Sequence, residues 1–352
     1  MRHHADMQTT LPEAAAGSVD DLTANEIRDA RARLGPRVLT TPVLQWEDPM
    51  LAARLPEGTR LTLKLELFQR TGSFKARGAL LNTDLLDEAQ KQRGITAISA
   101  GNHAIAAAFA AREAGTHAKV VMTATANPLR VARVRSFGGE VVLAPDVHAG
   151  FALVRRIEEE EGRTLLHPFE GRTTALGTAT LALEFLEQCP DLEAIVVPVG
   201  GGGLAAGVAN AVKVLAPQVQ VFGVEPEGAD SMHRSFAAGS PQPIERVATI
   251  ADSLGAPFAL PISYTFCRRH LDGLVKVTDE QLLEAMALLA ESAKLAVEPA
   301  GAAATAALLG PLRERLAGKR VGLIVCGANI DSATLATRLA QRPVAQAVSG
   351  SP

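Results

Sequence analysis

Short runs of aliphatic and β-branched residues alternate with longer helical stretches along most of this chain, and this alternation limits its possible folds. The expected strands cover residues 61–66, 96–99, 119–123, 140–144, 194–199, 219–224 and 321–326. Most of them precede a helical pattern, as at residues 102–113, 127–137, 147–161 and 204–215. Continuous apolar strands are typical of parallel sheets that helices cover on both faces. The sequence therefore predicts an α/β fold with twisted, mostly parallel sheets.

The chain length predicts two domains, because 352 residues exceed the roughly 150 residues of one typical domain. A βαβα pattern at residues 87–164 suggests a small inserted domain, which leaves residues 21–86 and 165–342 for a large domain. Residues 1–20 are polar or small and are predicted to be a disordered leader. Residues 343–352 are expected to form a loose tail.

Charge and composition exclude several functional classes. The formal net charge is -3, which provides no electrostatic surface for nucleic acid or an anionic membrane. No apolar run reaches the roughly 20 residues that a membrane helix needs, and the N-terminus lacks the apolar core of a secretory signal. The three cysteines lie far apart at Cys189, Cys267 and Cys326, which favours a reduced, cytoplasmic setting over disulfides or a zinc site.

A lysine lies at a predicted strand-to-helix junction, in the sequence Gln-Arg-Thr-Gly-Ser-Phe-Lys-Ala-Arg-Gly of residues 69–78. With Ser73 as the expected N-cap, Lys75 falls in the first helical turn, where the helix dipole disfavours an ammonium. Phe74 and Leu80 would desolvate it further. A lysine with a lowered pKa suits imine formation with an aldehyde. The alternative is an ordinary solvated lysine at a helix start.

The segment Ser99-Ala100-Gly101-Asn102-His103 also joins a predicted strand to a helix. Its successive backbone N–H groups could bind a carboxylate, and Asn102 could hydrogen-bond a ring hydroxyl. His103 has Ala107 four residues later, so a zinc pair is excluded there. A hydrogen-bonded, half-buried histidine is the preferred interpretation of His103.

Four consecutive glycines, Gly200, Gly201, Gly202 and Gly203, precede Leu204 at another strand-to-helix junction. Their N–H groups could bind a phosphate at the helix N-terminus. The same segment also satisfies a dinucleotide pattern through Gly200, Gly202 and Ala205, with Glu225 about 20 residues further on. This segment alone leaves both alternatives open.

Cys326 ends the last expected strand and is followed by Gly327, Ala328 and Asn329. Ligands of open α/β sheets bind at the carboxyl ends of strands, so this thiol could contact a ring nitrogen. The alternative is a buried structural cysteine.

These four segments, in this order, resemble the fold-type II pyridoxal-phosphate enzymes over residues 22–339, in the serine/threonine dehydratase (threonine ammonia-lyase) branch that is related to serine racemase. The resemblance implies a two-domain, tryptophan synthase β-like fold. It implies that Lys75 carries pyridoxal 5'-phosphate as a Schiff base and that Asn102 contacts the 3'-hydroxyl. The resemblance further assigns the phosphate to Gly200, Gly201, Gly202, Gly203 and Leu204, and the pyridine nitrogen to Cys326. The loop from Ser99 to His103 would bind the substrate carboxylate.

The implied reaction converts L-threonine, L-serine or another β-hydroxy amino acid to a 2-oxo acid and ammonia. Several residues depart from the family pattern, among them Leu67, Ile105, Ser253 and residues 177–180, and they leave the preferred substrate open. The family's divalent-cation site would use Glu225 and the Ala229 carbonyl, but Ser231 stands where an acidic ligand is expected.

Racemisation and β-replacement are the alternative pyridoxal-phosphate activities, and a nicotinamide oxidoreductase is a more remote one. Racemases of the family carry a serine where Ala100 stands, so racemisation is expected to be at most a side reaction. The remaining expectations are a small-molecule amino-acid substrate and a homodimer or homotetramer.

Overall fold

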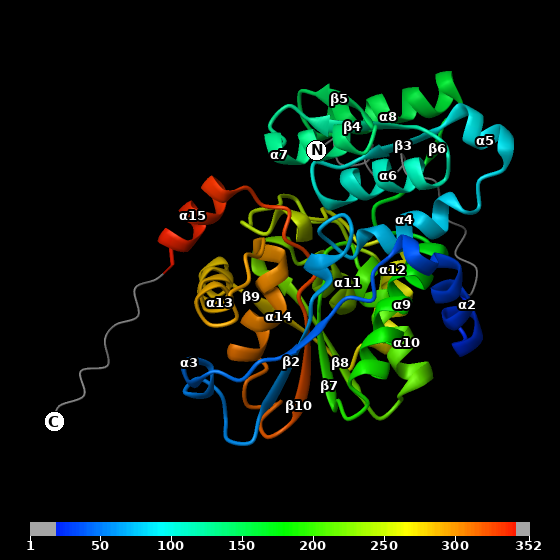
Figure 1. Ribbon diagram of the computed structural model, residues 1–352. Coiled ribbons are helices and arrows are strands. Elements are labelled where there is room, and N and C mark those ends of the chain that lie inside the picture. Colours follow the sequence, from blue (N-terminus) through cyan, green and yellow to red (C-terminus); the bar gives the residue numbers. More distant parts are fainter. Residues whose placement is uncertain (1–18, 343–352) are drawn as a thin grey trace.

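The computed structural model describes residues 19–342 and contains two sheets, which lie one above the other in Figure 1. The predicted tail and nearly all of the predicted leader lie outside the described residues. The larger sheet has the order β1 (Val43–Gln45), β2 (Arg60–Lys64), β10 (Arg320–Ile324), β7 (Ala194–Pro198), β8 (Gln220–Pro226) and β9 (Gly273–Val277). The smaller sheet has the order β5 (Glu140–Ala144), β4 (Ala118–Thr123), β3 (Ile95–Ile98) and β6 (Thr164–Leu165).

The strands are parallel throughout both sheets except at one edge, where β1 pairs with β2 in the antiparallel direction. In the larger sheet, Val321 of β10 lies opposite Leu61 on one side and Ala194 on the other. The predicted α/β class with mostly parallel sheets is confirmed. Each expected strand is present with its ends shifted by at most two residues. The division into domains at residues 87 and 164 stays a prediction.

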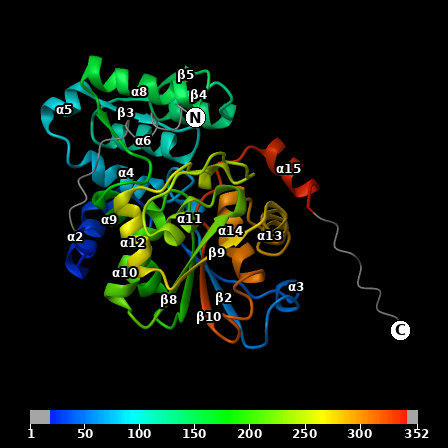
Figure 2. The same ribbon diagram turned by 180° about the vertical axis from the view of Figure 1, so that it is seen from behind.

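Helices cover both faces of the sheets, as the two opposite views in Figures 1 and 2 show. The α-helices of the described chain are α2 (Ala24–Leu34), α3 (Pro49–Ala52), α4 (Lys75–Thr83), α5 (Glu88–Arg93), α6 (Asn102–Glu113), α7 (Pro128–Ser136), α8 (Val147–Glu161), α9 (Arg172–Gln188), α10 (Gly203–Leu215), α11 (Ser231–Ala238), α12 (Pro261–His270), α13 (Asp279–Glu291), α14 (Pro299–Leu309) and α15 (Ser332–Ala340). Helix α14 packs against β7, β8 and β9, while α10 contacts β7, β8, α9 and α12. No helix within residues 19–342 is long and apolar enough to cross a membrane.

The smaller sheet separates two hydrophobic layers. Alternate residues of a strand point to opposite faces, so Val120 joins the cluster of α6, whereas Val121 joins Ala144 and Val154 of the α8 side. Helix α4 lies between the two sheets and packs against both α6 and α9. The lysine at the start of α4 is thereby placed where the two sheets face each other.

Candidate active site

A cavity of about 380 Å³ lies between the carboxyl ends of the two sheets. This is within the range of small-molecule sites. The structure brings together at this cavity all the cofactor and substrate residues that the sequence predicts: Phe74, Lys75, Ser99, Ala100, Gly101, Asn102, His103, Gly200, Gly201, Gly202, Gly203, Leu204 and Cys326. They come from four junctions that are distant in the sequence, and their individual roles stay predictions.

Lys75 is the first residue of α4, but the predicted N-cap is wrong, because Phe74 rather than Ser73 occupies that position. Ser73 forms an isolated bridge with Gly327, and the Phe74 N–H donates to the Cys326 carbonyl at 3.2 Å. These bonds extend the pairing beyond the end of β10, so the helix begins later than its sequence suggests. They also fix Lys75 next to Cys326.

The Lys75 side chain is partly buried at the cavity wall, and its Nζ donates to the Pro168 carbonyl oxygen at 2.5 Å. Burial lowers the pKa of this amine to about 8, although Glu298 acts in the opposite direction. The Phe74 ring centroid lies 5.0 Å from Nζ. A fraction of the amine is therefore neutral at physiological pH, as reaction with an aldehyde requires.

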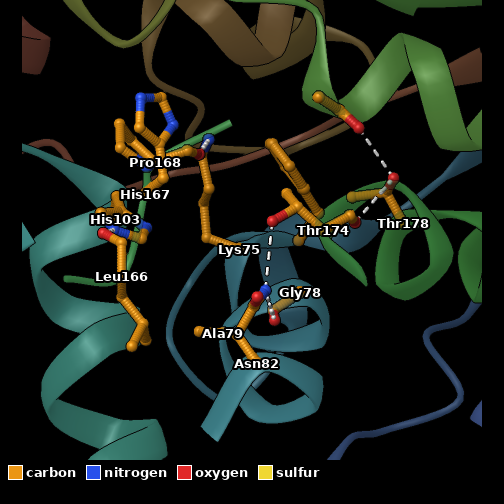
Figure 3. Close-up of a pocket in the computed structure, with 12 residues that line it drawn as sticks. Lys75, Gly78, Ala79, Asn82, His103, Leu166, His167, Pro168, Thr174 and Thr178 are labelled. Atoms are coloured by element: carbon orange, nitrogen blue, oxygen red, sulfur yellow. Dashed lines mark hydrogen bonds between the residues drawn. The ribbon is translucent and has the colours of Figure 1, made fainter. Parts of the chain in front are cut away.

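A second, water-sized cavity of about 10 Å³ adjoins Lys75 (Figure 3). Its lining includes His103, Asn82 and Thr174, and Asn82 Nδ2 donates to Thr174 Oγ1 at 3.1 Å.

Burial and the Lys75 charge lower the pKa values of His103 and His167 to about 3. Both imidazoles are thus neutral, and neither can supply a proton near pH 7.

A buried cluster of charged side chains holds the first turn of α4 in place. Arg77, two residues after Lys75, pairs with Glu66 at 2.9 Å and with Glu184 at 2.7 Å, and all three side chains are buried. Lys64 adds a further contact to Glu184 at 3.3 Å. Removing one partner of such a buried pair costs about 3–5 kcal/mol. The cluster therefore fixes the turn that presents Lys75 to the cavity.

Asn102 lies at the start of α6 and is held by a hydrogen-bonded chain. Its Nδ2 donates to Glu298 Oε1 at 2.6 Å, and its Oδ1 accepts from Asn329 Nδ2 at 2.6 Å. Arg130 of α7 approaches Glu298 at 3.6 Å and pairs with Asp252 at 2.5 Å. The amide of Asn102 thus has a fixed orientation at the cavity wall.

His103 follows Asn102 and is also buried. Its Nε2 lies 2.8 Å from the Leu166 carbonyl oxygen. This contact supports the interpretation of His103 as a hydrogen-bonded buried histidine.

The glycine segment forms a close-packed loop at the N-terminus of α10. Gly202 has φ +95°, a left-handed conformation that side chains rarely adopt. A Cβ atom at Gly201 would overlap the Phe169 ring, and one at Gly203 would overlap the Phe169 carbonyl oxygen. Only glycines allow this loop to bend so closely, and the α10 N–H groups that it exposes suit a phosphate.

Cys326 follows β10 and is almost fully buried. Its Sγ lies 3.4 Å from the Ala300 carbonyl oxygen. Burial raises the pKa of the thiol, with Glu298 adding to the effect, so the sulfur stays protonated. A lysine with a lowered pKa, a glycine loop at a helix N-terminus and a neutral thiol in one cavity together fit pyridoxal phosphate.

The residues of the predicted cation site do not fit a metal ion. Glu225 lies within β8, and both of its oxygens accept hydrogen bonds from N–H groups, of Met232 at 2.9 Å and of His233 at 2.7 Å. Burial raises the pKa of Glu225 to about 8. Within residues 19–342 no group of three or more His, Cys, Asp or Glu could hold a metal. Glu225 is also absent from the cavity lining, which argues against a ribose contact there and so against a nicotinamide site.

Sequence reasoning missed several residues of the cavity wall. Glu298 and Arg130 line it, as do Phe151 and Val154 of α8. Glu298 immediately precedes Pro299 and α14, and an acidic residue at a helix start has an ordinary explanation in the helix dipole. Only the tertiary structure shows that its carboxylate points at Asn102.

The fold and the cavity suit the class of α/β enzymes that bind a phosphate-bearing cofactor. Residues 38–327 match the family model described as pyridoxal-phosphate dependent enzyme. The chain belongs to this family, and its cofactor is pyridoxal phosphate.

Three known proteins illustrate the similarity. The phenylserine dehydratase of Ralstonia pickettii is 54% identical over 331 residues, which are 94% of this chain and 97% of that protein. The L-threonine ammonia-lyase of Thermotoga maritima is 37% identical over 78% of this chain and 68% of its own. The structure of maize serine racemase aligns with a TM-score of 0.85 at 35% identity, over 91% of this chain and 98% of that one.

Proposed function

We propose that this chain is a dehydratase of β-hydroxy amino acids, with a preference for an aromatic group on the β-carbon. 3-Phenylserine would lose water and then gain water on release of ammonia, which gives phenylpyruvate. The observation that carries the reaction class is the convergence of Lys75, the glycine loop and Cys326 on one cavity. The relatives named phenylserine dehydratase and L-threonine ammonia-lyase support it.

Lys75 is the proposed catalytic base. Its amine, with a pKa of about 8, can take the proton from Cα of the bound amino acid. When bound, pyridoxal phosphate supplies the conjugated ring that takes up the electron pair released at Cα. The protonated Lys75 then stands ready to give its proton to the departing β-hydroxyl, so the C–O bond breaks without a second acid.

The other residues bind and orient. We assign the phosphate to Gly200, Gly201, Gly202, Gly203 and Leu204, the ring hydroxyl to Asn102, and the substrate carboxylate to the loop from Ser99 to His103 at the N-terminus of α6. Cys326 would face the ring nitrogen. Because its thiol remains neutral, it cannot stabilise a positive charge on that nitrogen as a carboxylate would. Prompt loss of the β-hydroxyl is then favoured over repeated exchange of the Cα proton.

The preference for an aromatic substrate rests on the cavity wall. The chain contains only 11 Phe, one Trp and one Tyr. Four of these phenylalanines nevertheless line this one cavity: Phe74, Phe151, Phe169 and Phe258. Phe169 and Phe258 have ring centroids 6.2 Å apart, within the range of favourable aromatic pairs. Such a wall can make many more apolar contacts with a phenyl ring than with the methyl group of threonine.

Steady-state kinetics test this function. The pyridoxal-phosphate enzyme should release ammonia and phenylpyruvate from 3-phenylserine in equal amounts. Its kcat/KM should exceed that for L-threonine by at least about tenfold, because even one methylene in an apolar pocket discriminates by that much. Turnover of threonine or serine alone would leave the reaction class intact and refute the aromatic preference. Release of a β-substituted product from a serine ester and a thiol, without ammonia, would refute the dehydratase.

A further inference from the structure

The end of the cavity beyond the loop of residues 99–103 is apolar. Ile98 and Leu165 line it from the ends of β3 and β6, and Val121 lines it from β4. Together with Val154 of α8, these residues belong to the small hydrophobic cluster between α8 and the sheet. The cavity therefore opens onto one end of a hydrophobic core, where an apolar group would find contacts already in place.

One stripe of α8 forms the opposite wall. Gly150, Phe151, Val154, Arg155 and Glu158 line the cavity. Their spacing of one, three and four residues places them on one side of a helix. The first three are apolar and lie in the first two turns, whereas the charged Arg155 and Glu158 follow further along. The apolar part of this wall thus ends at Val154, and the charged part begins at Arg155.

We infer that this stripe, with Phe151 and Val154 as its contact residues, is the subsite that receives and selects the β-substituent of the substrate. This inference rests on the proposed function, because it assigns the aromatic group of that substrate to a particular helix. A ring that extends past Ala100 would complete the hydrophobic cluster around Val121 and Val154.

A charged β-substituent fits this wall less well. Arg155 is the basic residue on the stripe. Burial raises the pKa of Glu158, and the positive charge of Arg155 opposes this shift. Glu158 is thus an acidic neighbour of Arg155 on the same stripe. A β-carboxylate, as in 3-hydroxyaspartate, would have to compete with Glu158 for Arg155.

Two variants test the subsite, and a third serves as control. Val154→Phe fills the space and Phe151→Ala removes an aromatic contact. Each should lower the ratio of kcat/KM for 3-phenylserine to kcat/KM for L-serine by at least about tenfold. Ala152→Phe adds a ring on the same helix, where the side chain is exposed, and should leave the ratio within about twofold. Val154 is buried in the core, so Val154→Phe could prevent folding. In that case the ratio measured with Phe151→Ala decides the test.

Binding provides a second readout that does not depend on turnover. L-Phenylalanine lacks a β-hydroxyl and cannot eliminate water, so its Kd with the pyridoxal-phosphate enzyme can be measured by calorimetry. Phe151→Ala should raise the Kd of L-phenylalanine by at least about tenfold more than it raises the Kd of L-alanine. An unchanged ratio in both assays would overturn the subsite, provided the unaltered enzyme prefers 3-phenylserine. If the unaltered enzyme instead prefers serine or 3-hydroxyaspartate, the proposed function itself fails.

Discussion

Lys75 Nζ donates to the carbonyl oxygen of Pro168 at 2.5 Å, so the amine is aimed at the residues just before Phe169, which packs on the glycine loop. The Pro168 carbonyl thereby connects Lys75, the proposed base, to the glycine loop, the proposed phosphate site. Burial also lowers the pKa of Lys75 to about 8. The position at which α4 begins thus determines the surroundings of this lysine.

The lowered pKa of Lys75 predicts a pH profile. The amine must be neutral to accept the Cα proton, so kcat should rise about tenfold per pH unit below a value near 8 and level off above it. His103 and His167 have pKa values of about 3 and should add no inflection between pH 5 and 8. Initial rates between pH 5.5 and 10 with saturating substrate measure this, and a flat profile would contradict the role of Lys75 as base.

Glu298→Gln should move that profile to lower pH. The negative charge of Glu298 raises the pKa of Lys75, so its removal lowers the pKa further and leaves the amine neutral at more acidic pH. The glutamine keeps an oxygen that can accept from Asn102. A profile that stays in place, with the fold shown intact by circular dichroism, would exclude Glu298 from this electrostatic role.

Ala100 should restrict the enzyme to elimination. Racemisation needs a second acid on the face of Cα opposite Lys75, and the methyl group of Ala100 at the cavity wall cannot supply a proton. Ala100→Ser should therefore raise the ratio of D-serine formed from L-serine to pyruvate by at least about tenfold. Chiral chromatography of the reaction mixture gives both amounts. D-Serine that accumulates as fast as pyruvate with the unaltered enzyme would refute this assignment.

Removal of divalent cations should change neither activity nor stability. Both Glu225 oxygens already accept backbone N–H groups, and Ser231 supplies no carboxylate. Loss of a tightly bound ion would lower Tm by roughly 5 °C in a chain of this size. Thermal unfolding with and without EDTA distinguishes the cases, and a drop in Tm that Mg²⁺ or Ca²⁺ reverses would establish a cation site.

The sequence predicts the buried strands well, because continuous Val and Ile runs such as β7 have few alternatives to the centre of a parallel sheet. It does not predict β1, β6 or β9, which lie at sheet edges, are short or half-buried, and depend on a neighbouring strand for their conformation. Ser73 was expected to cap α4, but tertiary pairing with Gly327 overrides that local preference.

Much of the candidate site could be predicted because Lys75, Asn102 and the glycines lie at helix starts, and Cys326 directly follows the end of a strand. Phe151 and Val154 carry no such signal, since apolar residues on an amphipathic helix ordinarily pack on a sheet. Their place on the cavity wall follows from the packing of α8 beside the carboxyl ends of the smaller sheet's strands, and no local pattern contains that information.

The most direct test of the account locates the cofactor. Borohydride reduction of the yellow pyridoxal-phosphate enzyme, followed by proteolysis and mass spectrometry, should find the reduced cofactor on the peptide that contains Lys75. Lys75→Ala should lose this label and reduce turnover by a factor of about 10²–10⁴ or more, while keeping the fold. A label on another lysine, or no covalent label at all, would contradict the assignment of Lys75 and with it the proposed mechanism.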